Sequence, residues 1–139
     1  MDNNNEPKAL WIFENGHNCA ESVLKATENF CNLKENDEIT QMCSILSNGM
    51  GIGCFCGAVL VGIMLLGRLF NPATAKRLRI RLLWNFREKF PDFNCQSLKN
   101  HSPDSGCETV MAYVCHMIEE FISEEELVVS EPTMLYSKK

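Results

Sequence analysis

The chain has 139 residues, of which 45% are hydrophobic and 22% are charged, and its formal net charge is −5 at pH 7. This composition is typical of one globular domain. It excludes a disordered or collagen-like chain, and the negative net charge argues against nucleic-acid binding. We therefore expect a single cysteine-rich domain over residues 1–139, with residues 1–7 and 130–139 loosely ordered.

The eight cysteines are the unusual feature of this composition. The N-terminal residues carry neither the basic nor the apolar region of a secretory signal, so we expect a cytoplasmic protein. In that reducing compartment the thiols are expected to serve as metal ligands, redox thiols or small buried side chains, and not as four structural disulfides.

The first part of the chain predicts helices, because apolar residues recur at helical spacing and do not alternate as in strands. We expect a short helix over 9–15, closed by Gly16. The next helix is expected to follow Asn18, whose side chain forms a capping box with Glu21. A further helix is expected over 37–46.

The glycine-rich stretch over 47–53 predicts the most flexible backbone of the chain. Apolar residues then surround the following helix on all sides, which predicts a buried central helix at about 54–69. No charged residue occurs from Ile39 to Gly67. Since glycines interrupt this run, we expect a core helix and no membrane insertion.

In the second half, Asn71 followed by Pro72 predicts the start of a basic helix that ends at Pro91. Residues 92–104 are expected to be irregular, and a capping-box pattern at Ser105 opens the last helix. The sequence therefore predicts an all-α fold, a compact bundle of five to six helices around the central one.

Two of these expected helices carry opposite charge. We expect two solvated faces, while pairing within one chain or across a homodimer remains open. The basic residues are Lys76, Arg77, Arg79, Arg81, Arg87 and Lys89, and the acidic ones are Glu119, Glu120, Glu124, Glu125, Glu126 and Glu131.

Four cysteines share one setting, since each stands where a helix is expected to begin: Cys19, Cys56, Cys95 and Cys107. Unpaired N–H groups and the positive end of the helix dipole favour a thiolate there, so we expect the pKa of each thiol to be lowered. We predict that these helix starts converge on one sulfur-rich site, where the four cysteines act as redox thiols or as metal ligands.

The remaining cysteines have other settings. Cys31, Cys43 and Cys115 lie in apolar stripes and are expected to fill the core. Among the histidines, His17 is best placed to modulate a thiolate. Four residues of the glycine-rich region are expected to let the backbone approach a bound cofactor: Gly51, Gly53, Gly57 and Cys54.

Several kinds of site are excluded by spacing. No C-x-x-C pair occurs in the chain, which excludes zinc ribbons, thioredoxin-like motifs and C-x-x-C-H haem attachment. The glycine-rich stretch lacks the Gly-Lys-Ser/Thr ending of a phosphate loop. No pattern of nucleophile and base indicates hydrolytic chemistry.

The cysteines and their neighbours resemble a known family. The matching residues are Gly16-His17-Asn18-Cys19-Ala20, Cys56-Gly57-Ala58 with Gly62, Phe86 with Cys95, and Cys107 with Val110. In this order they resemble the C_GCAxxG_C_C family, named for its cysteine pattern and proposed to be redox-active. Val61 stands where the pattern places glycine, and Cys54 is an additional thiol.

The resemblance implies that the four cysteines at the expected helix starts are the family's characteristic ones. It also implies a gene near transporter genes. A related domain occurs in split-Soret cytochromes, where an iron–sulfur cluster accompanies haem, and only the cluster would apply to a chain without a haem motif.

We therefore expect a redox-active or iron–sulfur protein with an electron-transfer or thiol partner, in which four thiols ligate a cluster or form two exchanging pairs. Two alternatives remain open. One is a zinc or other soft-metal thiolate module without turnover. The other is a helical dimerisation or interaction protein with structural cysteines. Whether the chain is an enzyme remains open as well.

Overall fold

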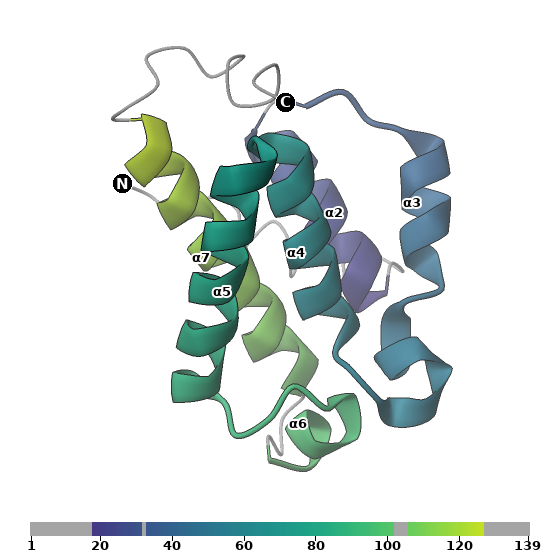
Figure 1. Cartoon of the computed structure of the whole chain (residues 1–139). Helices are drawn as coiled ribbons and strands as arrows, with labels where there is room; N and C mark the ends of the chain where they lie inside the picture. The colour runs from purple at the N-terminus through teal and green to yellow at the C-terminus, as the bar shows by residue number, and fades with distance from the viewer. Residues whose placement is uncertain (1–17, 32, 102–105, 127–139) are drawn as a thin grey trace.

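The computed structural model of the chain describes residues 18–31, 33–101 and 106–126. Within these ranges every regular element longer than a single bridge is helical, which confirms the all-α prediction (Figure 1). The α-helices are α2 (Cys19–Phe30), α3 (Asp37–Ser44), α4 (Gly57–Leu69), α5 (Pro72–Lys89), α6 (Cys95–His101) and α7 (Gly106–Glu126). The helix expected over 9–15, and the ends at 1–7 and 130–139, lie outside the described residues.

The start of α2 follows the predicted capping box. Asn18 Oδ1 accepts the backbone N–H of Glu21 at 2.8 Å, and Glu21 Oε1 accepts the backbone N–H of Asn18 at 3.1 Å. The Asn18 amide also donates to the Ser44 carbonyl at the end of α3. This hydrogen bond joins the start of α2 to the last turn of α3. Helix α3 ends at Ser44, two residues before the expected position.

An irregular turn over Gly49–Gly53, labelled η1, joins α3 to α4. Its backbone is left-handed at Asn48, Gly49, Met50, Gly51 and Gly53. At Gly49 a Cβ atom would overlap with the backbone of Cys54, so only glycine fits there. The glycines of this stretch thus let the chain turn back tightly before α4.

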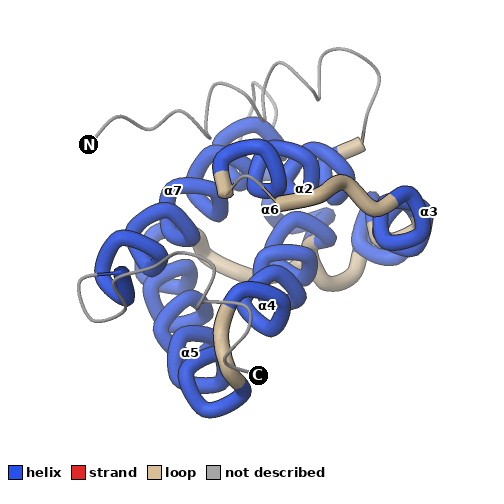
Figure 2. Tube along the Cα trace, turned by 90° about the horizontal axis from the view of Figure 1, so that it is seen from above, coloured by secondary structure: helices blue, strands red, loops and turns tan. Residues whose placement is uncertain are grey.

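Helix α4 is the central helix of the bundle, as predicted, with α2, α5 and α7 packed around it (Figure 2). It begins at Gly57, three residues later than expected, and Cys56 is its N-cap residue. One edge is open, because Met64 is 41% exposed where α4 faces α3 across a pocket. None of the described helices is both long and apolar enough to cross a membrane.

Helices α5 and α7 pack together and join the two charged blocks within one chain. Arg81 Nη1 lies 2.7 Å from Glu124 Oε1, and Arg77 Nη2 lies 3.1 Å from Glu125 Oε2. The expected solvated acidic face is wrong for Glu119, whose side chain is buried. Consecutive residues of a helix point in different directions, so Glu119 lies on the inward side of α7 while its neighbour Glu120 is exposed.

The prediction that residues 92–104 are irregular is wrong for the middle of this segment, where Cys95–His101 form helix α6. Asn94 Oδ1 accepts the backbone N–H of Ser97 at 3.0 Å and so caps the helix. The Leu98 side chain is buried and anchors the helix to the bundle. Cys95 and Leu98 alone leave no periodic pattern in seven residues, so the sequence indicated a helix start at Cys95 but not the helix that follows it. The cap expected at Ser105 lies outside the described residues.

Candidate functional site

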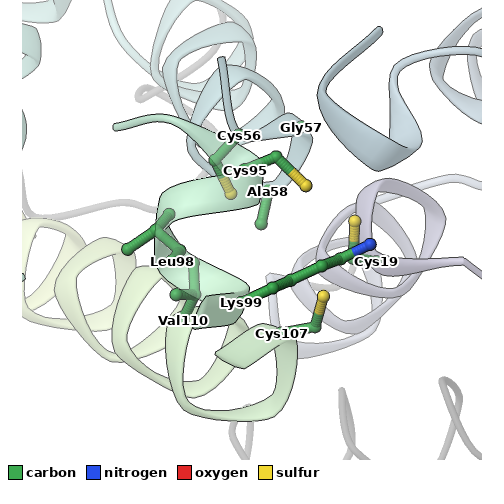
Figure 3. Close-up of a pocket in the computed structure, with 9 residues that line it drawn as sticks. All are labelled: Cys19, Cys56, Gly57, Ala58, Cys95, Leu98, Lys99, Cys107 and Val110. Atoms are coloured by element: carbon green, nitrogen blue, oxygen red, sulfur yellow. The ribbon is translucent and has the colours of Figure 1, made fainter. Parts of the chain in front are cut away.

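The four helix starts meet at one end of the bundle. Cys19 is the first residue of α2, Cys56 caps α4, Cys95 is the first residue of α6, and Cys107 is the second residue of α7. All four side chains line one pocket, and Figure 3 shows their sulfurs directed into it. We call it the thiol pocket; its other lining residues are Gly57, Ala58, Leu98, Lys99 and Val110.

The thiol pocket is small. Its volume is about 10 Å³, which is room for about one water molecule. The side chains of Cys19, Cys56 and Cys95 are each 8% exposed or less, whereas Cys107 is partly exposed. Cys107 is therefore the most accessible of the four sulfurs.

Cys19 and Cys107 form a hydrogen-bonded pair. The Cys19 thiol donates to the Cys107 sulfur, and this hydrogen bond, with the nearby positive charge of Lys99, lowers the pKa of Cys107 to about 6 despite partial burial. The same hydrogen bond, together with burial, raises the pKa of Cys19. The pair thus holds one proton at neutral pH, and Cys107 carries the negative charge.

The expected lowering of the pKa is wrong for three of the four thiols, because the hydrogen bond to Cys107 raises the pKa of Cys19 and burial raises that of Cys56 and Cys95. Burial raises the pKa of Cys56 to about 11, although the N–H groups of Val59 and Ala58 point at its sulfur and act in the opposite direction. Burial also raises the pKa of Cys95, while the hydrogen bond to Cys107, together with burial, raises that of Cys19. At a buried sulfur such as Cys56, the cost of removing the thiolate from water outweighs the favourable effect of the N–H groups at the helix start.

Two polar residues of the site were missed in the sequence. Lys99 lines the pocket from α6, and its Nζ donates to Asn48 Oδ1 at 2.8 Å. The backbone N–H of Asn48 donates to the Cys19 sulfur. The spacing of Cys95 and Lys99, one helical turn, would have indicated Lys99 only if the segment had been recognised as a helix.

A short antiparallel pairing holds the starts of α4 and α6 side by side. Phe55 and Asn94 form an isolated bridge. On one side of it the Cys56 N–H donates to the Phe93 carbonyl at 2.7 Å, and on the other the Cys95 N–H donates to the Cys54 carbonyl at 2.5 Å. This pairing brings Cys56 and Cys95 to the same pocket from positions far apart in the chain.

The residues expected to bind a cofactor are only partly brought together. Gly57 lines the thiol pocket, and a Cβ atom on it would overlap with the Leu46 carbonyl. Gly51 faces open space and Gly53 lies beside Gln96, while Cys54 is exposed. Gly51, Gly53 and Cys54 are not among the described residues that line the thiol pocket. Their role in cofactor binding therefore stays a prediction.

The remaining predictions concern the other cysteines and the histidines. Cys43 and Cys115 are buried, as expected of core residues, and Cys31 is half-buried against the core. His116 Nε2 lies 2.8 Å from Glu120 Oε2 on α7. His17 lies outside the described residues.

The arrangement of the side chains bears on metal binding. In residues 18–31, 33–101 and 106–126, no group of three or more His, Cys, Asp or Glu side chains is arranged to hold a metal ion. Four thiols are the donor set of an iron–sulfur cluster. A pocket of about 10 Å³ is nevertheless too small for a cluster, so the residues as they are arranged do not fit one.

One comparison with known proteins gives a match. A family model described as "Putative redox-active protein (C_GCAxxG_C_C)" matches residues 17–121. No curated protein and no solved structure matches the chain.

Proposed function

Because the chain belongs to the C_GCAxxG_C_C family of putative redox-active proteins, we propose that it is a thiol redox protein in which Cys107 and Cys19 exchange between two thiols and a disulfide. The hydrogen-bonded pair of Cys19 and Cys107 carries this proposal. A cytoplasmic location suits a protein whose working thiols are reduced.

The chemistry starts at Cys107. Its pKa of about 6 makes it mostly thiolate at neutral pH, and it is the most accessible sulfur of the pocket. The thiolate attacks one sulfur of a substrate disulfide, and the other sulfur leaves as a thiolate. The result is a mixed disulfide between Cys107 and the substrate.

Cys19 completes the exchange. It attacks the Cys107 sulfur, gives up its proton, and displaces the second substrate sulfur, which leaves as a thiol. The substrate disulfide is reduced to two thiols, and the two cysteines are oxidised to one disulfide. Holding Cys19 against Cys107 before the reaction favours this second step over release of the mixed disulfide.

Peptide mapping tests this proposal. The reduced chain is treated with oxidised glutathione at pH 7, free thiols are alkylated, and linked peptides are identified by mass spectrometry. We expect a Cys19–Cys107 disulfide that dithiothreitol reverses. Cys107→Ser should abolish it, and Cys31→Ser, which removes a thiol outside the pocket, should not. A chain in which Cys107 reacts no faster than Cys31 would contradict the proposal.

The lining of one pocket by all four thiols favours a second candidate function, ligation of an iron–sulfur cluster. Binding would require the helix starts to move apart, since the pocket is too small as arranged. Anaerobic purification with analysis of iron, sulfide and zinc separates the candidates. Protein with iron and sulfide favours the cluster, one zinc per chain favours a metal module, and metal-free protein with a reversible disulfide favours thiol exchange.

A further inference from the structure

Cys54 is a thiol outside the thiol pocket that has a defined position relative to it. Its side chain is exposed, and its carbonyl accepts the backbone N–H of Cys95 at 2.5 Å. The bridge between Phe55 and Asn94 is antiparallel. Cys54 therefore stands directly opposite Cys95, one position out from the bridge.

This pairing sets the distance between the two residues. The hydrogen bond from the Cys95 N–H to the Cys54 carbonyl brings the two backbones to the spacing of paired strands, at which opposite Cα atoms are about 5.5 Å apart. A disulfide requires Cα atoms about 4.4–6.8 Å apart. Cys54 and Cys95 thus occupy backbone positions that a disulfide can join.

The two residues also link solvent to the pocket. Cys95 lines the thiol pocket and is 7% exposed, whereas Cys54 is open to solvent. Burial and, to a smaller extent, the charge of Cys107, which lines the same pocket, raise the pKa of Cys95. One of the two cysteines therefore lines the pocket with the buried thiols, and the other is open to solvent.

From this juxtaposition we propose that Cys54 and Cys95 form a second redox pair that returns Cys19 and Cys107 to the reduced state, using electrons from an external dithiol. The proposal rests on the function proposed above. It assigns Cys54, which the family pattern does not include, as the thiol that meets the reductant.

The steps are two exchanges within the chain and one with the reductant. Cys95 attacks Cys107 in the Cys19–Cys107 disulfide, and Cys19 leaves and takes the proton of Cys95. Cys54 then attacks Cys95 and releases Cys107 as a thiolate, while the proton of Cys54 passes to solvent. The external dithiol attacks the exposed Cys54 sulfur, becomes a disulfide itself, and leaves Cys54 and Cys95 as thiols. Two electrons pass from the dithiol to the pocket.

Reduction kinetics test the proposal. The oxidised full-length chain is mixed with reduced thioredoxin, a dithiol too bulky for the pocket, or with a small phosphine. Loss of the Cys19–Cys107 disulfide is followed by alkylation and peptide mapping. We expect Cys54→Ser to slow reduction by thioredoxin at least about tenfold and to leave reduction by the phosphine unchanged. Cys31→Ser should match the unmodified chain with both reductants, and a Cys54–Cys95 peptide should be trapped at intermediate times.

The outcomes separate the two proposals. If no Cys19–Cys107 disulfide forms with any oxidant, the proposed function is wrong. If it forms, but Cys54→Ser is reduced by thioredoxin at the unmodified rate, the second pair is wrong. A trapped Cys54–Cys56 disulfide in place of Cys54–Cys95 would also overturn it.

Discussion

Lys99 supplies positive charge to a pocket that is otherwise lined by thiols and apolar groups. It acts on two sulfurs in the same sense, since it favours the thiolate of Cys107 and offsets part of the effect of burial on the pKa of Cys95. Its hydrogen bond to Asn48 Oδ1 holds the ammonium group at the edge of the pocket. Lys99 is therefore a positioning residue for the thiolate.

Replacing Lys99 tests this role. We expect Lys99→Met to raise the pKa of Cys107 and to slow its alkylation by iodoacetamide about threefold at pH 6.5, because the thiolate loses a favourable charge. The measurement is the pH dependence of the alkylation rate of Cys107, read by peptide mapping. Lys76→Met makes the same charge change on the exposed face of α5 and should leave the profile unchanged. Identical profiles for both variants would exclude the role of Lys99.

At the scale of the elements, α4 begins in close contact with the segment that follows α3. The contact depends on Gly57, because a Cβ atom there would overlap with the Leu46 carbonyl. Gly67 lies near the other end of the same helix, where a Cβ atom would meet nothing within 4 Å. Packing thus requires glycine at position 57, whereas position 67 has room for a side chain.

This difference predicts opposite effects for the same substitution. Gly57→Ala should lower the free energy of unfolding by about 1–3 kcal/mol, because the backbone must shift to admit the methyl group. Gly67→Ala should raise it by about 0.5–1 kcal/mol, because alanine has the higher helix propensity. Urea unfolding of both variants measures this. Equal effects would show that the contact at Gly57 can relax at no cost.

The elements also show where sequence reasoning succeeded. The starts of α2 and α5 were predicted because Asn18 and Asn71 leave strong local patterns, and Asn71 Oδ1 indeed accepts the Thr74 N–H at 2.9 Å. The start of α6 was indicated by Asn94 alone, which is too weak a pattern for a helix of seven residues. Local capping was predictable, whereas a helix held by the tertiary contact of Leu98 was not.

At the scale of the whole molecule, convergence of the four cysteines on one pocket agrees with the expectation that helix starts meet at one end of the bundle. The pKa values of the four thiols do not all show the predicted lowering, because the burial of each sulfur depends on the packing of several helices. Cys107 remained partly exposed and acidic, while burial raised the pKa of Cys56. No sequence pattern records that depth.

These opposite shifts predict how stability depends on pH. The pKa of Cys107 is about 6 in the folded chain and 9.0 ordinarily, so between these values the unfolded chain binds more protons and stability rises with pH. This contribution is complete above pH 9 and is lost as the pH falls through 6. The pKa of Cys56 is raised to about 11, so its contribution is complete below pH 9 and is lost as the pH rises through 11.

Unfolding of the reduced chain in urea from pH 5 to pH 10.5 measures both effects. Cys107→Ser should flatten the rise between pH 6 and 9 relative to the unmodified chain, and Cys56→Ser should reduce the fall above pH 9. Cys31→Ser corrects for the loss of a thiol elsewhere. A rise that persists in Cys107→Ser would assign it to other groups.

The positions of Cys19 and Cys107 have a further consequence for the lifetime of the protein. Cys19 is the first residue of the first described helix, and Cys107 is the second residue of the last one. A disulfide between them closes a loop of roughly 90 residues, and the lost chain entropy of the unfolded state stabilises the fold by about 4.5 kcal/mol at 25 °C. Oxidation would thus join the first and last described helices covalently, and reduction would separate them again. The redox state of the cell would thereby set how often this chain opens to proteases.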